Sequence, residues 1–183
     1  DAAGKLSVSF RLWDVLSERQ YAGKSFTVDS RNWRRVSHLI ADEIYKRLTG
    51  EDGYFDSRVV YVAESGGKAR KDRVKRLAIM DQDGANQKYL TNGKALVLTP
   101  RFSPNSQTLI YMAFSSKVPS VYVYDLETGR QELLGSFQGM SFAPRFSHDG
   151  NYAVMSVAQS GTSEIYEINL DTRQKNRLTN DLS

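Results

Sequence analysis

The sequence predicts a mainly β fold, a partial β-propeller of about three blades preceded by the end of a small α/β domain. A pattern of residues recurs with a period of 44 positions in the later part of the chain. Each copy holds short segments in which apolar and polar residues alternate, as they do in strands. Four strands in about 40–45 residues are the length of one propeller blade.

The repeat is clearest at the first strand of each copy. Pro100–Asn105 recurs as Pro144–Asp149. We expect each proline to open a strand, where a ladder donor is not needed. We also expect Phe102 and Phe146 to occupy equivalent buried positions. The same spacing relates three leucines, Leu90, Leu134 and Leu178.

The expected strands of the second repeat are Leu98–Ser103, Thr108–Phe114, Ser120–Asp125 and Arg130–Leu134. The first repeat, Arg58–Thr91, has three strands and lacks an innermost one, and the third ends near Thr179. A propeller ring needs about four to eight blades. We therefore expect the chain to be a piece of a longer protein.

The segment before the repeats predicts two strands and one helix. Alternation over Leu6–Leu12 indicates a half-buried strand, and Phe26–Val28 is a second candidate. Asp29 or Ser30 is expected to cap a helix that ends near Leu48. The residues that share its apolar face are Trp33, Val36, Ile40, Ile44 and Leu48.

This pattern divides the chain in two. We expect residues 1–55 to be the C-terminal part of an N-terminal α/β domain and residues 56–183 to be the first three blades. Gly50 is expected to end the helix.

Composition excludes several classes of function. The chain has no cysteine, which excludes disulfides, thiolate metal sites and a cysteine nucleophile. No apolar run approaches the roughly 18–20 residues that a membrane-spanning helix needs. The net charge is +4, and much of the excess lies in Lys68–Arg76. That run could contact nucleic acid, but a solvated hairpin tip is favoured because no aromatic residue is interleaved for stacking.

Catalytic chemistry is not apparent in the motifs. His38 and Asp42 lie one helical turn apart and could share a metal, although such a pair is more often a solvated or capping contact. Asp81 and Asp83 have the start of a calcium-loop pattern, but Asn92 stands where a bidentate glutamate is needed. We therefore expect a hairpin turn there, no catalytic residue, no cofactor and no metal.

Four segments are similar to one known family. His38–Asp42, Leu48–Phe55, Arg58–Val62 and Asp81–Gln87 resemble the junction and first-blade turn of the TolB family, the periplasmic propellers of the bacterial Tol-Pal envelope system. The resemblance covers essentially the whole chain. It implies an α/β domain, a six-bladed propeller and a non-catalytic, protein-binding scaffold that supports outer-membrane integrity and cell division. The implied partners are the lipoprotein Pal at the propeller mouth, TolA through the N-terminal end, and colicins in some species.

The resemblance places partner binding where each blade returns to the next one. Here those segments are Asn92–Thr99 and Ser136–Ala143. Some family members carry a contacting histidine where this chain has Met140. Apolar residues are expected to be exposed there, although they could instead pack between blades. The predicted partner-binding residues are Leu96, Val97, Met140, Ser141 and Phe142.

Two other functions compete with this scaffold. Similar repeats form the propeller of prolyl-oligopeptidase-like peptidases, which would require a hydrolase domain elsewhere. Nucleic-acid binding would depend on Lys68–Arg76, a hairpin tip that we expect to lie away from the propeller mouth. We expect no nucleic-acid partner and no membrane embedding.

Overall fold

The computed structural model describes residues 4–69, 72–115, 118–137, 140–159 and 161–180, with the backbone alone for residues 140–142 and 159. Two compact units make up the chain. The first contains residues 1–59 and 81–85, and the second contains residues 60–80 and 86–183. The hairpin turn 81–85 thus groups with the N-terminal unit.

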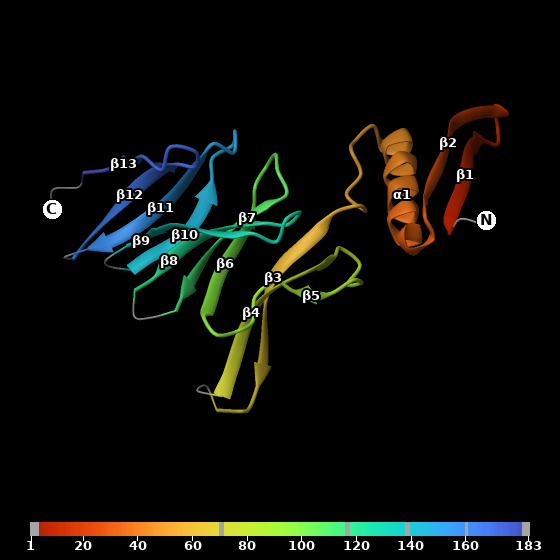
Figure 1. Cartoon of the computed structure of the whole chain (residues 1–183). Coiled ribbons are helices and arrows are strands. Elements are labelled where there is room, and N and C mark those ends of the chain that lie inside the picture. Colours follow the sequence, from red (N-terminus) through yellow and green to blue (C-terminus); the bar gives the residue numbers. More distant parts are fainter. Residues whose placement is uncertain (1–3, 70–71, 116–117, 138–139, 160, 181–183) are drawn as a thin grey trace. The chain divides into compact units, whose positions relative to one another are not determined.

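A β-hairpin and one helix form the N-terminal unit (Figure 1). Strands β1 (Lys5–Asp14) and β2 (Arg19–Asp29) pair antiparallel. Along β1 exposed and half-buried residues alternate strictly, which confirms the predicted strand. Since successive side chains of a strand point to opposite faces, only one face of this hairpin is covered.

The helix begins with a 3₁₀ turn, η1 (Ser30–Asn32), and continues as α1 (Trp33–Thr49). Asp29 accepts a hydrogen bond from the amide of Arg31, and Gly50 ends the helix in the left-handed conformation. The predicted apolar face is only partly correct. Val36 is buried, whereas the side chains of Trp33 and Leu48 at its two ends are exposed.

The second unit contains three antiparallel sheets that follow one another along the chain (Figure 1). Their strand orders are β3-β4-β5, β6-β7-β8-β9 and β10-β11-β12-β13. The three-stranded first sheet and the four-stranded second and third sheets agree with the predicted blades. The strands are β3 (Arg58–Gly66), β4 (Arg73–Asp81), β5 (Lys88–Tyr89), β6 (Leu96–Phe102), β7 (Thr108–Phe114), β8 (Ser120–Asp125), β9 (Gln131–Ser136), β10 (Met140–Phe146), β11 (Tyr152–Gln159), β12 (Thr162–Asn169) and β13 (Lys175–Arg177).

The first strands of the second and third sheets share a bulge. The register shifts between Leu98 and Arg101 in β6, and at the equivalent place in β10. Thr99 and Ala143, 44 positions apart, both have positive φ, at 49° and 43°. The prolines that follow them are buried inside these strands. They do not open the strands as expected. The bulge frees them from donating to the ladder.

Apolar packing between successive sheets forms the core. Leu77 of the first sheet packs with Leu109 and Tyr111 of the second sheet. Ile110 and Met112, which point the other way, pack with residues of the third sheet. The half-buried rings of Phe102 and Phe146 pack on these two clusters, one on each.

A hydrogen bond also links the second and third sheets at equivalent turns. The Nδ2 of Asn105 donates to the carbonyl of Asp149 at 2.7 Å, exactly one repeat away in sequence. A polar contact therefore accompanies the apolar packing between these two sheets.

Candidate partner-binding surface

The first return loop joins β5 to β6 and is fixed to strand β4. The amide of Leu90 donates to the carbonyl of Leu77 at 2.7 Å. The hydroxyl of Thr91 accepts from the amide of Leu77 at 2.9 Å. Asn92 then accepts from the amide of Lys94 at 3.0 Å, which turns the chain toward β6. These bonds give the loop a defined conformation.

Gly93 is required in this loop for two reasons. Its φ of +81° is one that side-chain-bearing residues rarely adopt. A Cβ at this position would also meet Cγ1 of Val74 at 2.4 Å and Nε of Arg76 at 3.1 Å. The return loop therefore packs directly against the beginning of β4.

The sequence suggested that Leu96 and Val97 lie in an exposed loop, and the structure shows that they do not. Both begin strand β6, where they pair with Phe114 and Ala113 of β7. Leu96 is 44% exposed, whereas Val97 is 2% exposed and packs in the core between the first two sheets. Because neighbouring strand residues point to opposite faces, Leu96 but not Val97 presents an apolar side chain to solvent.

Met140, Ser141 and Phe142 begin strand β10, one repeat after Leu96 and its neighbours. Their backbones pair with residues 156–158 of β11. This too corrects the expectation of a loop. The side chains of these three residues lie outside the described part of the structure. The assignment of all five residues to partner binding stays a prediction.

A crevice of about 310 Å³ opens beside the first return loop. Val97, Tyr111 and Ala113 contribute buried apolar surface to it. The rings of Tyr111 and Tyr122 stack with their centroids 5.7 Å apart. Burial raises the pKa of Tyr111, so its hydroxyl stays neutral. The lining residues are Thr91, Asn92, Lys94, Ala95, Val97, Tyr111, Ala113, Ser115, Tyr122 and Gln131.

The sequence pattern did not indicate this crevice or the tyrosines that line it. The recurrence of Tyr122 as Tyr166 marked a repeat position, but it gave no sign of an opening. The neighbouring glycine, Gly93, is the nearest available signal, since a glycine between Asn92 and Lys94 is typical of a tight turn.

The basic hairpin lies at the same end of the sheets as this loop, contrary to expectation. Strand β4 runs away from the hairpin tip, and β5 pairs antiparallel to it, with Ala78 opposite Tyr89. Strand β5 therefore runs toward the beginning of β4, and the return loop that follows Tyr89 continues in that direction. The contact of Gly93 with Val74 agrees with this placement. The first repeat has one strand fewer than the other two, so the 44-residue register alone did not show that the hairpin and the return loop lie at the same end.

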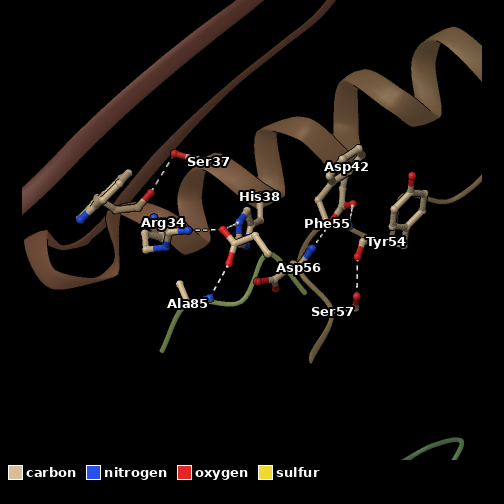
Figure 2. Close-up of polar contacts among 11 residues, drawn as sticks. Arg34, Ser37, His38, Asp42, Tyr54, Phe55, Asp56, Ser57 and Ala85 are labelled. Atoms are coloured by element: carbon tan, nitrogen blue, oxygen red, sulfur yellow. Dashed lines mark hydrogen bonds and ion pairs between the residues drawn. The ribbon is translucent and has the colours of Figure 1, made fainter. Parts of the chain in front are cut away.

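The sequence raised the possibility that His38 and Asp42 share a metal. In the structure each of them instead makes polar contacts with a different segment. His38 Nε2 lies 3.2 Å from Asp83 Oδ2, and Arg34 also contacts that carboxylate. Asp42 instead accepts from the amides of Phe55 and Asp56, at 2.7 and 3.1 Å. Figure 2 shows that His38 contacts the turn that contains Asp83, whereas Asp42 contacts the segment that contains Phe55.

Asp83 belongs to a turn, as predicted in preference to a calcium loop. Its Oδ1 accepts from the amide of Ala85 at 3.0 Å. That bond, with His38 and Arg34 beside the carboxylate, holds the pKa of Asp83 below its ordinary value. Within the described ranges, no group of three or more potential ligands is placed to hold a metal ion. Nor is any described helix long and apolar enough to cross a membrane.

Tandem antiparallel sheets of three or four strands, each packed face to face on the next, define a β-propeller protein. The family model for PD40, the TolB beta propeller domain, matches residues 45–183. The chain belongs to the TolB β-propeller family.

Relatives agree with this assignment. The Tol-Pal system protein TolB of Paramagnetospirillum magneticum is 57% identical over 125 residues, which are 68% of this chain and 28% of that protein. The crystal structure of TolB from Acinetobacter baumannii matches with a TM-score of 0.85 and 33% identity, covering 96% of this chain and 43% of that one. The chain thus spans less than half of either relative.

A peptidase propeller is a more distant likeness. The β-propeller domain of the Trilobed protease from Pyrococcus furiosus matches with a TM-score of 0.53 and 15% identity, covering 67% of this chain and 40% of that one. At this identity the likeness shows the fold alone.

Proposed function

We propose that this chain belongs to a non-catalytic protein-binding scaffold of the Tol-Pal cell-envelope system. In this proposal the propeller mouth binds the lipoprotein Pal, and the scaffold supports outer-membrane integrity and cell division in the periplasm. TolA would bind through the N-terminal end, and colicins could use the same scaffold. Membership of the TolB family and the identity to a Tol-Pal system protein support this role.

A single observation carries the proposed binding surface. Leu96 is substantially exposed at the start of an inner strand, directly after a return loop and beside a crevice. Contiguous exposed apolar patches tend to mark protein-binding sites, and interface hot spots sit in well-packed recesses. The backbone equivalence of β6 and β10 matches Met140 with Leu96 and supports including Met140. Phe142 matches Leu98, which packs on the core, and is included from the sequence resemblance.

The test is a calorimetric titration of Pal against the full-length protein. We expect Leu96→Ala, Met140→Ala and Phe142→Ala each to weaken binding by about 1–2 kcal/mol, as interface residues of moderate importance do. Leu133→Ala is the matched control for Leu96, because Leu133 is also exposed but lies on the outer strand β9. Thermal unfolding of each variant detects misfolding.

Unchanged affinity in all three mouth variants would reject this surface. The alternative of a peptidase propeller makes a separate prediction, since a peptidase would turn over a peptide substrate. Turnover that survives repurification and is lost on substitution of one residue of this chain would favour that alternative.

A further inference from the structure

The positive charge of the chain is concentrated in one hairpin. Residues 64–76 contain six Lys and Arg residues against two acidic ones, which gives +4, the net charge of the entire chain. All other residues together are therefore balanced. Such an asymmetry attracts anionic partners to one place on a surface.

The hairpin also reaches further than its counterpart in the next sheet. Strand β4 begins at Arg73, whereas the equivalent strand β8 begins at Ser120, which matches position 76 in the repeat. Three additional residues of β4 therefore extend the ribbon at the end where the return loop lies (Figure 1). Arg73 and Lys75 lie on this extension.

Glu64 neutralises only part of the hairpin. It accepts from Arg73 Nη1 at 2.8 Å and lies 3.6 Å from Lys75 Nζ. Arg76 instead donates to the hydroxyl of Ser65 at 2.8 Å, which leaves its charge uncompensated by that contact. The remaining acidic residue is Asp72, at the exposed tip.

The return loop joins this basic ribbon to the crevice. Gly93 contacts Val74 and Arg76, while its neighbours Asn92 and Lys94 line the crevice. Lys94 is exposed, so its ammonium adds a positive charge at the crevice rim. A basic ribbon, a basic rim and a recess with an apolar floor and polar sides thus form one continuous surface.

We infer that this surface binds an acidic polypeptide segment whose carboxylates meet the β3–β4 hairpin and Lys94 while one large apolar side chain enters the crevice. The inference deepens the proposed function and rests on it, since it takes the bound molecule to be a protein. The apolar recess distinguishes the expected ligand from a purely anionic surface such as a bilayer.

The aromatic residues argue against nucleic acid. Base stacking needs an open aromatic face. Tyr89 is 60% exposed, and the guanidinium of Arg76 lies 5.1 Å from its ring centre, which leaves one face of this single ring for stacking. Tyr111 is buried against Tyr122 and offers no face to a base, so the described part of this surface lacks the row of open rings on which successive bases stack.

The experiment measures fluorescence anisotropy with a short labelled peptide of Asp and Glu around one Phe. The full-length protein is titrated with it over a series of salt concentrations. We expect the double variant Arg73→Glu with Lys94→Glu to weaken binding about tenfold, because rim charges steer and hold an oppositely charged ligand. Salt should weaken binding to the unaltered protein as well.

Two matched comparisons distinguish the contribution of charge to binding from the contribution of the crevice. Lys5→Glu with Arg11→Glu makes the same change in net charge on exposed positions of β1 and should leave binding unchanged. A peptide with Ser in place of Phe should bind more weakly. Ala95→Leu, which narrows the crevice, should remove the difference between the two peptides.

Several outcomes would overturn the inference. An equal loss of affinity in the β1 control variant would show that binding depends on net charge alone. Equal affinity for the Phe and Ser peptides would show that the crevice does not bind the apolar side chain. Tighter binding of a single-stranded oligonucleotide or of phosphatidylglycerol vesicles, lost in the Arg73 and Lys94 variant, would assign the surface to those ligands. Pal is titrated separately, so a failed peptide test with intact Pal binding rejects this inference and leaves the proposed function standing.

Discussion

The two units of the chain are stabilised by different contacts. In the repeats, strand β7 is covered on both faces, so that Leu109 and Ile110 are both fully buried although they point in opposite directions. In the N-terminal unit, Val36 is the fully buried residue of helix α1, and the ends of its apolar face are exposed. Polar contacts from Asp42 and Asp83 hold the loops beside that helix.

This difference indicates how each unit should respond to change. Apolar burial stabilises in proportion to the area removed from water and depends little on pH. Hydrogen bonds to a carboxylate depend on its geometry and its protonation. The repeats should therefore be most sensitive to truncation of a side chain, and the N-terminal unit to loss or protonation of an acceptor.

The largest effect is expected in the second sheet. Leu109→Ala should lower the free energy of unfolding by about 2–5 kcal/mol, because it leaves a cavity between two packed sheets. Leu133→Ala makes the same chemical change at a position that is 53% exposed. Urea unfolding of both variants measures the contrast. Similar losses for the two leucines would show that packing between the sheets does not dominate.

A moderate effect is expected from Asp42→Ala in the N-terminal unit. The substitution removes the acceptor of two partly buried amides, those of Phe55 and Asp56, at a cost of about 1–3 kcal/mol. Hydrogen exchange of these two amides should accelerate. Asp52→Ala is the control, since its pair with Lys46 is exposed and should matter little. Unchanged exchange in the Asp42 variant would refute the role of this carboxylate.

The strands of the repeats were predictable because each pattern occurs more than once. The expected strands Thr108–Phe114 and Ser120–Asp125 coincide with β7 and β8. In the N-terminal unit no second copy exists, and the predicted helix face was only partly right. Propensity and periodicity report local structure, so single-copy elements carry less information.

The candidate site was less predictable because it depends on contacts distant in sequence. Val97 is apolar and follows a loop, but its burial depends on packing against Leu77 and Tyr111. His38 and Asp42 share a helix, yet their partners come from other segments. The position of the basic hairpin depends on strand β5, which is only two residues long. None of these contacts between distant segments follows a periodic pattern, so the sequence did not predict them.

The smallest expected effect concerns the acid stability of the N-terminal unit. The amide of Ala85, with His38 and Arg34, holds the pKa of Asp83 below its ordinary value of 3.8. Below that value the unfolded chain takes up the proton first, so stability from this carboxylate is present above about pH 3.8 and is lost as the pH falls through the folded pKa. Asp83→Asn should therefore lower the Tm near neutral pH.

In strong acid the Tm curves of the two proteins should converge, since both then carry a neutral side chain at this position. Thermal unfolding from pH 2 to pH 7, followed by circular dichroism in the helix region, measures both curves. Curves that stay parallel throughout would show that the charge of Asp83 contributes nothing and that the substitution acts only through its altered hydrogen bonds. Convergence would show that protonation of a single turn residue weakens the packing beside α1, an effect that the apolar sheets of the repeats should not share.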